Sequence, residues 1–490
     1  MRSDPDRRPV RSVASRAIRA ARPGSPQRLR AREFLYREIP VNRRRALTGA
    51  VVVGIALATI VNSFGISGAS AASHGGPREH PRLQIATTST SEKRGATASG
   101  FSLNTSTGPT RTAGRPRTSD PTTTTVLATT TTQPDTTTTT APATKSTGRA
   151  TAHEPMKDFA IQPATLTPAE YNSLLDLAVR AGAKVISLDV TWSSYEPNGP
   201  SPQGEWTSLD AFVKDVVGRR LELRFQLVGF PNWARDAGDP SSASAYWLAP
   251  SSAAELSRWS AFVSRVAGHF GTEVTYYEIW NEENISAFWS SGPDPTAYAR
   301  LLEASYTAIK SQDPSAQVMF GGISRNDVGF VAKTYGAIDR LFPATAESDH
   351  HFFDILGVHP YSGNRSPEAD GSHWVYSDQW GTMDENFMGI EMLHNLLVAE
   401  GEGWKHLYIG EYGFTTTTWE AFGPVRDSIR AQYLTDAFSL AAKTGYVDGL
   451  CWYYTYTTPW NPASWALLQG SYPNYQPTQT YDALAAVPDS

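Results

Sequence analysis

The sequence predicts an α/β fold for residues 153–490, a (β/α)8 TIM barrel that follows a membrane or signal segment and a disordered Thr-rich linker. Short apolar strands alternate with helices eight times over this region, which is the pattern of a closed parallel barrel. The alternative is an open doubly wound sheet, which usually carries a glycine-rich phosphate turn after its first strand. The sequence contains neither G-x-G-x-x-G nor a Walker loop, so the barrel is favoured.

Helix starts are marked by capping signals. In Thr167-Pro168-Ala169-Glu170 a Thr stands at the N-cap, a Pro at the first helical position and a Glu at the third. A second capping box is formed by Ser252 and Glu255, before a helix that ends near residue 269, and Asp294-Pro295 starts a helix that reaches about residue 310. Further helices are predicted at 328–341, 385–400, 425–443 and 478–487. Strands are predicted at 159–161, 184–190, 221–228, 274–280, 317–323, 353–359, 407–411 and 447–453.

Two segments with the character of an export signal come first. Residues 1–45 contain 14 Arg, no Lys and four acidic residues, and form an Arg-rich cytoplasmic region or signal n-region. Residues 46–71 form a signal peptide or membrane anchor, because Ala46–Val61 is uncharged and Ala69-Ser70-Ala71 has the form of a signal-peptidase site. Cleavage near residue 71 and retention through residues 46–66 both fit. Either way we expect a secreted or membrane-anchored protein, located outside the cell or at the cell wall.

The export route is also left open by the sequence. The string Arg43-Arg44-Arg45-Ala46-Leu47 resembles a twin-arginine signal.

Residues 72–152 form a Ser/Thr/Pro-rich linker, and 13 of the 20 residues in 121–140 are Thr. Because this linker has no apolar pattern to bury, the entropy cost of ordering it is not offset and we expect disorder. Such a composition is typical of a stalk.

Charge and cysteine content exclude some functions for the region after residue 45. Residues 46–490 carry a net charge of −15, which argues against nucleic acid as a partner. Cys451 is the single cysteine and stands in an apolar run, so we expect a buried thiol and no internal disulfide. All 14 Trp lie at or after Trp192, which places the aromatic-rich globular part late in the chain.

Candidate functional residues stand at or near the ends of four of the expected strands. Strand four leads into Asn281-Glu282, strand six into His359-Pro360-Tyr361, strand seven into Glu411, and strand eight contains Trp452. The carboxyl ends of barrel strands form the functional face. Two carboxylates on opposite strands are what cleavage of a glycosidic bond requires, one to protonate the leaving oxygen and one to attack the anomeric carbon or activate water.

These residues carry a resemblance to a known group. Residues 155–487 resemble the clan A glycoside hydrolases, the cellulase-like retaining barrels, and above all families 5 and 39. The Asn281-Glu282 pair and Glu411 match the clan pattern in type, order and strand. The string Phe230-Pro231-Asn232-Trp233-Ala234 is similar to the P-x-W-A element of family 39, and Trp192 matches the second-strand pattern of that group.

The resemblance implies a role for each of these side chains. Glu282 would be the acid/base and Glu411 the nucleophile. Tyr361 would donate a hydrogen bond to Glu411, His359 would line the same pocket, and Asn281 would bind the sugar 2-hydroxyl.

Two tryptophans complete the implied substrate site. Trp452 would form the floor of the subsite and lie beside the two glutamates at one end of the barrel, and Trp192 is a further expected substrate-binding residue. Glu283 departs from the clan pattern, since many members have Pro at that position.

The implied activity is hydrolysis of O-glycosidic bonds in a β-linked polysaccharide or oligosaccharide by a retaining mechanism. A non-catalytic carbohydrate-binding barrel, a cell-wall transglycosylase and a structural cell-wall protein are the alternatives. We expect a carbohydrate substrate, a monomeric catalytic domain, and no cofactor, metal or nucleic acid. Asp349-His350-His351 with Asp354 lacks H-E-x-x-H spacing, so a solvated loop is the better interpretation of this group.

Overall fold

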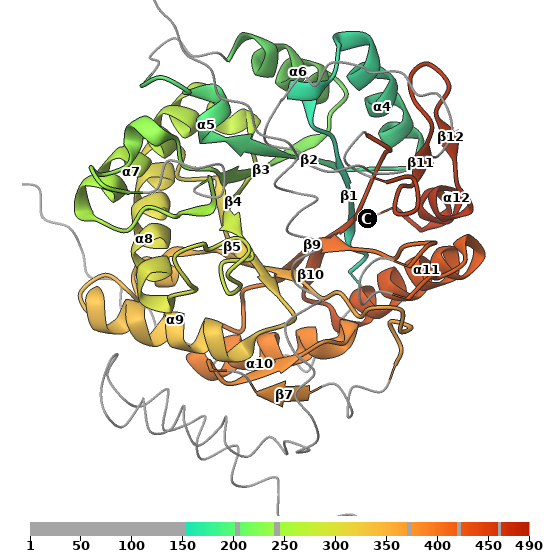
Figure 1. The fold of residues 1–490 in the computed structure, drawn as a ribbon. Coiled ribbons are helices and arrows are strands. Elements are labelled where there is room, and N and C mark those ends of the chain that lie inside the picture. The colour runs from blue at the N-terminus through green and yellow to red at the C-terminus, as the bar shows by residue number, and fades with distance from the viewer. Residues whose placement is uncertain are drawn as a thin grey trace, which may run out of the picture. The chain divides into compact units, whose positions relative to one another are not determined.

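A closed barrel of eight parallel strands lies at the centre of the described residues (Figure 1). The computed structural model describes residues 153–200, 206–239, 246–369, 375–377, 379–418, 423–458 and 462–489. The barrel strands are β1 (Met156–Ala160), β2 (Val185–Thr191), β3 (Glu222–Val228), β4 (Tyr276–Asn281), β5 (Gln317–Ser324), β6 (Ile355–His359), β9 (Leu407–Tyr412) and β10 (Val447–Trp452). They follow chain order around the barrel, and β10 pairs with β1 to close it. The predicted (β/α)8 barrel is confirmed.

Helices surround the strands in Figure 1, and at least one follows every barrel strand. They are α4 (Pro168–Arg180), α5 (Trp192–Tyr195), α6 (Thr207–Gly218), α7 (Ala253–Phe270), α8 (Pro295–Gln312), α9 (Val328–Leu341), α10 (Ile390–Glu400), α11 (Asp427–Thr444) and α12 (Gln479–Ala486). Short strand pairs lie outside the barrel, formed by β7 (Val375–Ser377) with β8 (Thr382–Asp384) and by β11 (Leu468–Gln469) with β12 (Gln476–Pro477).

Both predicted capping boxes are present. The Thr167 hydroxyl accepts a hydrogen bond from the Glu170 backbone N–H, and the Glu170 carboxylate accepts one from the Thr167 N–H at 2.8 Å. Ser252 and Glu255 repeat this arrangement, with both distances at 3.1 Å. Each box satisfies backbone donors at a helix start that would otherwise lack partners.

One predicted helix starts later than expected. Residues 385–400 were predicted as a continuous helix, but α10 begins at Ile390. The Asp384 carboxylate accepts a hydrogen bond from the Asn386 backbone N–H at 3.0 Å. Such a local side-chain turn competes with helical hydrogen bonding, so the segment before α10 forms a turn and a short 3-10 helix at Phe387–Gly389.

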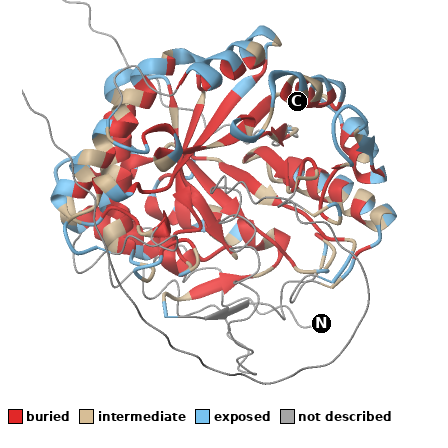
Figure 2. Ribbon diagram, turned by 45° about the horizontal axis from the view of Figure 1, so that its top comes forward, coloured by how far each residue is buried: buried red, intermediate tan, exposed pale blue. Residues whose placement is uncertain are grey.

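The core has two apolar parts. The larger cluster joins strand residues such as Phe225 and Ile279 to helix residues such as Phe262 and Leu302, and the barrel strands are almost entirely buried in Figure 2. The smaller cluster lies inside the barrel near the strand starts and contains Val185, Tyr276, Met319, Ile355 and Tyr408. It forms an apolar layer at the N-terminal end of the barrel, which leaves the other end for polar groups.

The segment before β6 corrects one expectation. His351 was expected in a solvated loop, but it is 1% exposed and lies between two carboxylates. Its Nδ1 is 3.0 Å from Glu402 and its Nε2 is 3.1 Å from Asp339. Burial lowers the pKa of His351, but hydrogen bonding to these carboxylates outweighs burial, so the pKa is raised overall.

The single cysteine, Cys451, is buried, as expected from the apolar run in which it stands.

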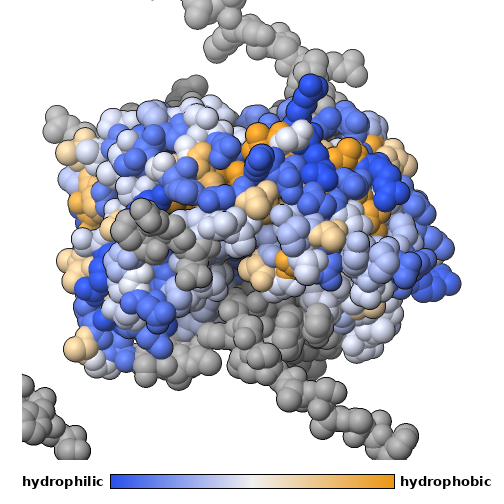
Figure 3. All heavy atoms as spheres, turned by 90° about the horizontal axis from the view of Figure 1, so that it is seen from above, coloured by the Kyte–Doolittle hydropathy of each residue, from blue (hydrophilic) through white to orange (hydrophobic). Residues whose placement is uncertain are grey.

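The face shown in Figure 3 is mainly hydrophilic, with hydrophobic residues in small groups. Among the described residues the exposed large hydrophobic side chains come from separate elements, namely Val179, Val217, Val398, Trp404 and Tyr472. No helix in the described ranges is long and apolar enough to cross a membrane. The segments predicted at 1–45, 46–71 and 72–152 lie outside these ranges.

Candidate active site

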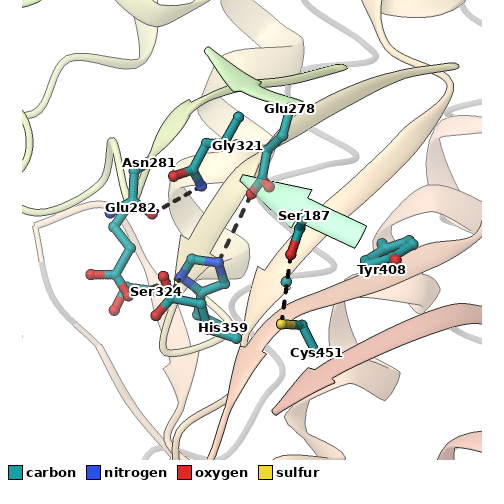
Figure 4. Close-up of polar contacts among 12 residues, drawn as sticks. Ser187, Glu278, Asn281, Glu282, Gly321, Ser324, His359, Tyr408 and Cys451 are labelled. Atoms are coloured by element: carbon teal, nitrogen blue, oxygen red, sulfur yellow. Dashed lines mark hydrogen bonds and ion pairs between the residues drawn. The ribbon is translucent and has the colours of Figure 1, made fainter. Parts of the chain in front are cut away.

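The two predicted glutamates meet at the carboxyl ends of their strands, near the same nitrogen of one imidazole. Glu411 lies near the end of β9, and Glu282 directly follows β4. His359 Nδ1 is 3.2 Å from Glu282 Oε1 and 3.8 Å from Glu411 Oε2. Figure 4 shows the His359 ring between Glu282 and Glu278. The fold therefore brings the two carboxylates and His359 into one cluster.

The charge of Glu411 depends on its surroundings. Burial raises the pKa of the Glu411 carboxyl to about 7, and the charge of Glu282 acts in the same direction. The His359 charge opposes this rise, as does the Tyr361 hydroxyl, which donates a hydrogen bond to Glu411 Oε2 at 2.9 Å. Glu411 therefore changes its charge near neutral pH.

His359 carries a positive charge in this setting. Burial lowers the pKa of His359, but the charge of Glu411 and the hydrogen bond with Glu282 outweigh it. A third carboxylate, Glu278, lies 3.9 Å from Nε2. Together they raise the pKa of His359 to about 9, so the imidazolium partly neutralises the cluster at neutral pH.

A buried ion cluster supports Glu278 from inside the barrel. Arg224 on β3 donates to Glu278 and, at 2.8 Å, to Asp158 on β1. It also donates to the Gly410 carbonyl at 3.3 Å, and Tyr408 donates to Asp158 at 2.9 Å. These strands are thus tied together beneath the two glutamates, which makes this part of the barrel rigid.

Two glycines of β5 make room for the site. A Cβ atom at Gly322 would overlap the His359 ring, and a Cβ atom at Gly321 would overlap a Glu283 carboxylate oxygen. Both residues are therefore required to be small by close contacts rather than by backbone conformation. Gly322 is the register partner of Asn281 on β4, so the space for His359 lies beside the Asn281-Glu282 turn.

The backbone around Glu282 is unusual. Trp280 and Glu282 have φ angles of 71° and 41°, which are uncommon for residues with a Cβ atom. Asn281 lies between them, is 2% exposed, and accepts a hydrogen bond from Gln226 Nε2 at 3.2 Å. Such local strain is held by the surrounding structure and clusters at functional sites.

Glu283 differs from its neighbour Glu282 in its surroundings. It is fully buried, and neither carboxylate oxygen has a hydrogen-bond partner among the described residues. Burial raises the pKa of Glu283 well above its usual value, which favours the uncharged form of this side chain. The contact with His359 belongs to Glu282, which distinguishes the two adjacent glutamates.

A pocket opens beside Glu411 at the carboxyl ends of the strands, and Glu282 and His359 are not among its lining residues. Glu411 lines it together with polar and aromatic residues from β1, β2, β3 and β10 or the segments after them, including Gln162, Asp189, Gln226, Tyr453 and Tyr454. Carboxylates, amides and aromatic rings are the groups that bind sugar hydroxyls and the apolar faces of sugar rings. Among the described residues, no group of His, Cys, Asp and Glu has an arrangement that could hold a metal ion.

The prediction that Trp192 binds substrate is corrected. Trp192 is fully buried, stacks on Phe230 and Phe262, and donates from Nε1 to Glu196 at 2.8 Å. It does not line the pocket. As the first residue of α5 it has left the strand alternation of β2, and its ring packs into the aromatic core.

The expected floor residue Trp452 is also buried away from the pocket. It is 1% exposed and packs against Tyr412 and Phe414. Successive strand residues point to opposite faces. Cys451 lines the pocket, so its neighbour Trp452 points outward to the helices. The tyrosines after β10, Tyr453 and Tyr454, take the aromatic position instead.

Several site residues were not selected from the sequence. Glu278 and Arg224 stand at mid-strand positions, where a charge signals a buried partner but does not identify it. Asp189 and Gln226 are neighbours in the register of β2 and β3, and their alternation with apolar residues was the available signal. Only the closed barrel shows that Arg224, Asp189 and Gln226 line one pocket.

The likeness to known proteins lies in the fold. No protein-family model and no curated protein matches the chain. A family 39 glycoside hydrolase from the gut symbiont Bacteroides cellulosilyticus WH2 matches with a TM-score of 0.52 and 20% identity, covering 68% of this chain and 63% of that chain. GH5_18 from Streptomyces cattleya, solved in complex with GlcNAc, matches with a TM-score of 0.50 and 13% identity, covering 69% and 80%. The resemblance inferred from the sequence is thus confirmed for the fold: the chain has a (β/α)8 barrel similar to those of these two glycoside hydrolases.

Proposed function

We propose that this protein is a retaining glycoside hydrolase that cleaves β-linked oligosaccharides or polysaccharides. The observation that carries the proposal is the convergence of Glu282 and Glu411 on His359 Nδ1 at the carboxyl ends of β4 and β9. This arrangement supplies the two carboxyl groups that glycosidic cleavage requires, and one of them, Glu411, lines a polar pocket.

The proposed mechanism assigns one role to each carboxylate. Glu411 attacks the anomeric carbon, forms a glycosyl–enzyme bond and displaces the leaving oxygen, which receives a proton from Glu282. Glu282 then removes a proton from water, and the water attacks the anomeric carbon and releases Glu411. Tyr361 donates to Glu411 and stabilises its anionic form before attack, and the His359 charge acts in the same direction on Glu411.

A panel of dinitrophenyl β-glycosides tests this proposal. The panel should include the xyloside, the glucoside and the N-acetylglucosaminide, the last because the GH5_18 structure holds GlcNAc. We expect the wild-type chain to release dinitrophenol from at least one of them. Glu411→Ala should lose activity by about 10⁴-fold or more, because neither chemical step can proceed without the nucleophile.

Glu282→Ala should fail differently from Glu411→Ala. Dinitrophenol leaves without protonation, so the first step should survive and the covalent intermediate should accumulate. A burst of dinitrophenol followed by slow turnover is expected, and added azide should accelerate turnover and give a β-glycosyl azide. Wild-type activity in Glu411→Ala would contradict the assignment. Sugar binding without any hydrolysis would favour the non-catalytic carbohydrate-binding barrel.

Export through residues 46–71 belongs to the same proposal, since polysaccharides lie outside the cell. Expression of the full chain in its native host, followed by cell fractionation, tests it. We expect the barrel in the medium or on the cell surface, with its N-terminus near residue 72 if the signal is cleaved. Recovery of full-length chain in the cytoplasm alone would contradict this proposal.

A further inference from the structure

The pocket beside Glu411 contains a second carboxylate that the proposed mechanism does not use. Asp189 lies on β2, on the pocket lining, next to Gln226 on β3. Its backbone N–H donates to the Gln162 side-chain oxygen at 3.3 Å. Burial raises the pKa of Asp189 to about 6 and the charge of Glu278 adds to this rise, while Arg224 and Gln162 lower it. A pKa of about 6 favours the ionised form of Asp189 at neutral pH, and in that form its carboxylate accepts hydrogen bonds.

The cation that lines this pocket is already neutralised. Arg224 lies between the carboxylates of Asp158 and Glu278, and a further donor of its guanidinium binds the Gly410 carbonyl. His359, the other cation of the site, contacts Glu282, Glu411 and Glu278. Some short segments between residues 201 and 461 lie outside the described residues, and their sequences contain no Lys or Arg. Nothing among the described lining residues therefore offers a free positive charge to an acidic ligand.

This charge pattern discriminates between classes of sugar. A uronic acid would bring its carboxylate close to Asp189 and Glu411, and like charges in a partly buried pocket repel. The hydroxyl groups of a neutral sugar can donate to the Asp189 carboxylate, and hydrogen bonds to a charged acceptor are about twice as strong as neutral ones. The amides of Gln162 and Gln226 supply further polar contacts at the same wall.

We propose that Asp189 binds hydroxyl groups of the sugar in this pocket and makes the pocket selective for neutral sugars over uronic acids. The inference rests on the proposed function and adds the substrate class to it. Asp189 is then a specificity-determining residue that contacts the substrate away from the reacting bond.

The test uses the dinitrophenyl β-glycoside that the wild-type chain cleaves best, with its monodeoxy analogues and the matched uronides. The variants are Asp189→Ala, Asp189→Asn and the control Asp482→Asn, which changes an exposed aspartate on α12. We expect Asp189→Ala to lower kcat/KM for the neutral glycoside by about 10- to 100-fold, with no loss in the control.

Coupling between the variant and the sugar separates binding from a structural role. Removing one particular hydroxyl should lower kcat/KM by a similar factor in the wild type but by little in Asp189→Ala, because the lost contact is the same one. In the wild type, kcat/KM for the uronide should be lower than kcat/KM for the matched neutral glycoside by a factor of about 100 or more. This difference should become smaller in Asp189→Asn. These ratios do not depend on the fraction of folded protein.

Each other result counts against the inference. A uronide or a free amino sugar as the preferred substrate would contradict it, as would deoxy-sugar losses that are unchanged in Asp189→Ala. Hydrolysis with an unaffected Asp189→Ala would overturn this inference alone. Failure to cleave any glycoside would overturn the proposed function, and the inference with it.

Discussion

The ionisation of Glu411 is set by a few neighbouring side chains. Burial raises the pKa of its carboxyl to about 7, while the Tyr361 hydrogen bond and the His359 charge act against this rise. A nucleophile acts in its ionised form, so kcat/KM should fall as the pH decreases through about 7. Removing a donor that favours the charged carboxylate shifts the pKa upward.

Tyr361→Phe should therefore move the acid limb of the pH profile to higher pH by about one unit, because hydrogen bonds to charged groups contribute about 1.5–3 kcal/mol and one pKa unit corresponds to about 1.4 kcal/mol. The measurement is kcat/KM against pH on a dinitrophenyl glycoside, which does not depend on the proton donor. An acid limb at the wild-type pH would show that Tyr361 does not control the ionisation of Glu411.

At the residue level, the sequence located the polar centre of the site but not its aromatic walls. Glu282, Glu411, His359 and Tyr361 follow directly from the strand ends, and the fold brings them together. The orientation of an aromatic side chain near a strand end depends on which face of the barrel it points to. The Trp452 ring points outward for this reason, and the sequence alone does not fix the face.

At the level of single elements, the glycines of β5 leave space for the side chains of the site. Gly322→Ala would place a methyl group against the His359 ring, which is fully buried. We expect the free energy of unfolding to fall by about 1–3 kcal/mol, as for overpacked cores. We also expect kcat to fall by about 100-fold, because displacing His359 disturbs both glutamates.

Gly218→Ala is the matched control, since no atom lies within 4 Å of a Cβ at this last residue of α6. Its stability should stay unchanged or rise by up to about 1 kcal/mol. Urea unfolding and the aryl glycoside assay measure both effects. Full activity in Gly322→Ala would show that the space beside β5 does not hold His359 in place.

The elements themselves were predictable to the extent that their signals are local. Capping boxes fix the starts of α4 and α7 because the stabilising hydrogen bonds lie within four residues. The start of α10 was missed because the turn at Asp384 and Asn386 competes with the helix, and an apolar pattern does not reveal that competition.

At the level of the whole molecule, β1 and the end of the chain close the barrel together. β1 pairs with both β2 and β10. Lys157 on β1 donates to the Ala181 carbonyl at 3.0 Å and to the Asp489 carboxylate at 3.1 Å. The interactions that complete the barrel therefore lie between residues 153 and 489.

A chain that begins at His153 should fold on its own and keep the kcat/KM of the full chain. We expect one cooperative thermal transition at the same temperature for both chains, because the described barrel contacts lie within the retained part. Differential scanning calorimetry and the glycoside assay measure this. Loss of folding in the shortened chain would show that residues before 153 contribute to the barrel.

The barrel was predictable because its evidence is repeated eight times along the chain, so single errors in element boundaries do not change the outcome. The pocket was less predictable, since Asp189, Gln226 and Arg224 come from adjacent strands whose shared face appears only when the barrel closes. Long-range charge pairs such as Arg224 with Asp158 have no local sequence signal.

The most direct test of the account is covalent labelling of the nucleophile. A 2,4-dinitrophenyl 2-deoxy-2-fluoro-β-glycoside of the preferred sugar should react with the wild-type chain and trap the glycosyl–enzyme intermediate, because fluorine slows both chemical steps while the good leaving group restores the rate of the first step alone. Mass spectrometry should show one added glycosyl group on the peptide that contains Glu411, and none on Glu411→Gln. A label on another residue, or net inversion of the anomeric centre with no label, would contradict the proposed mechanism.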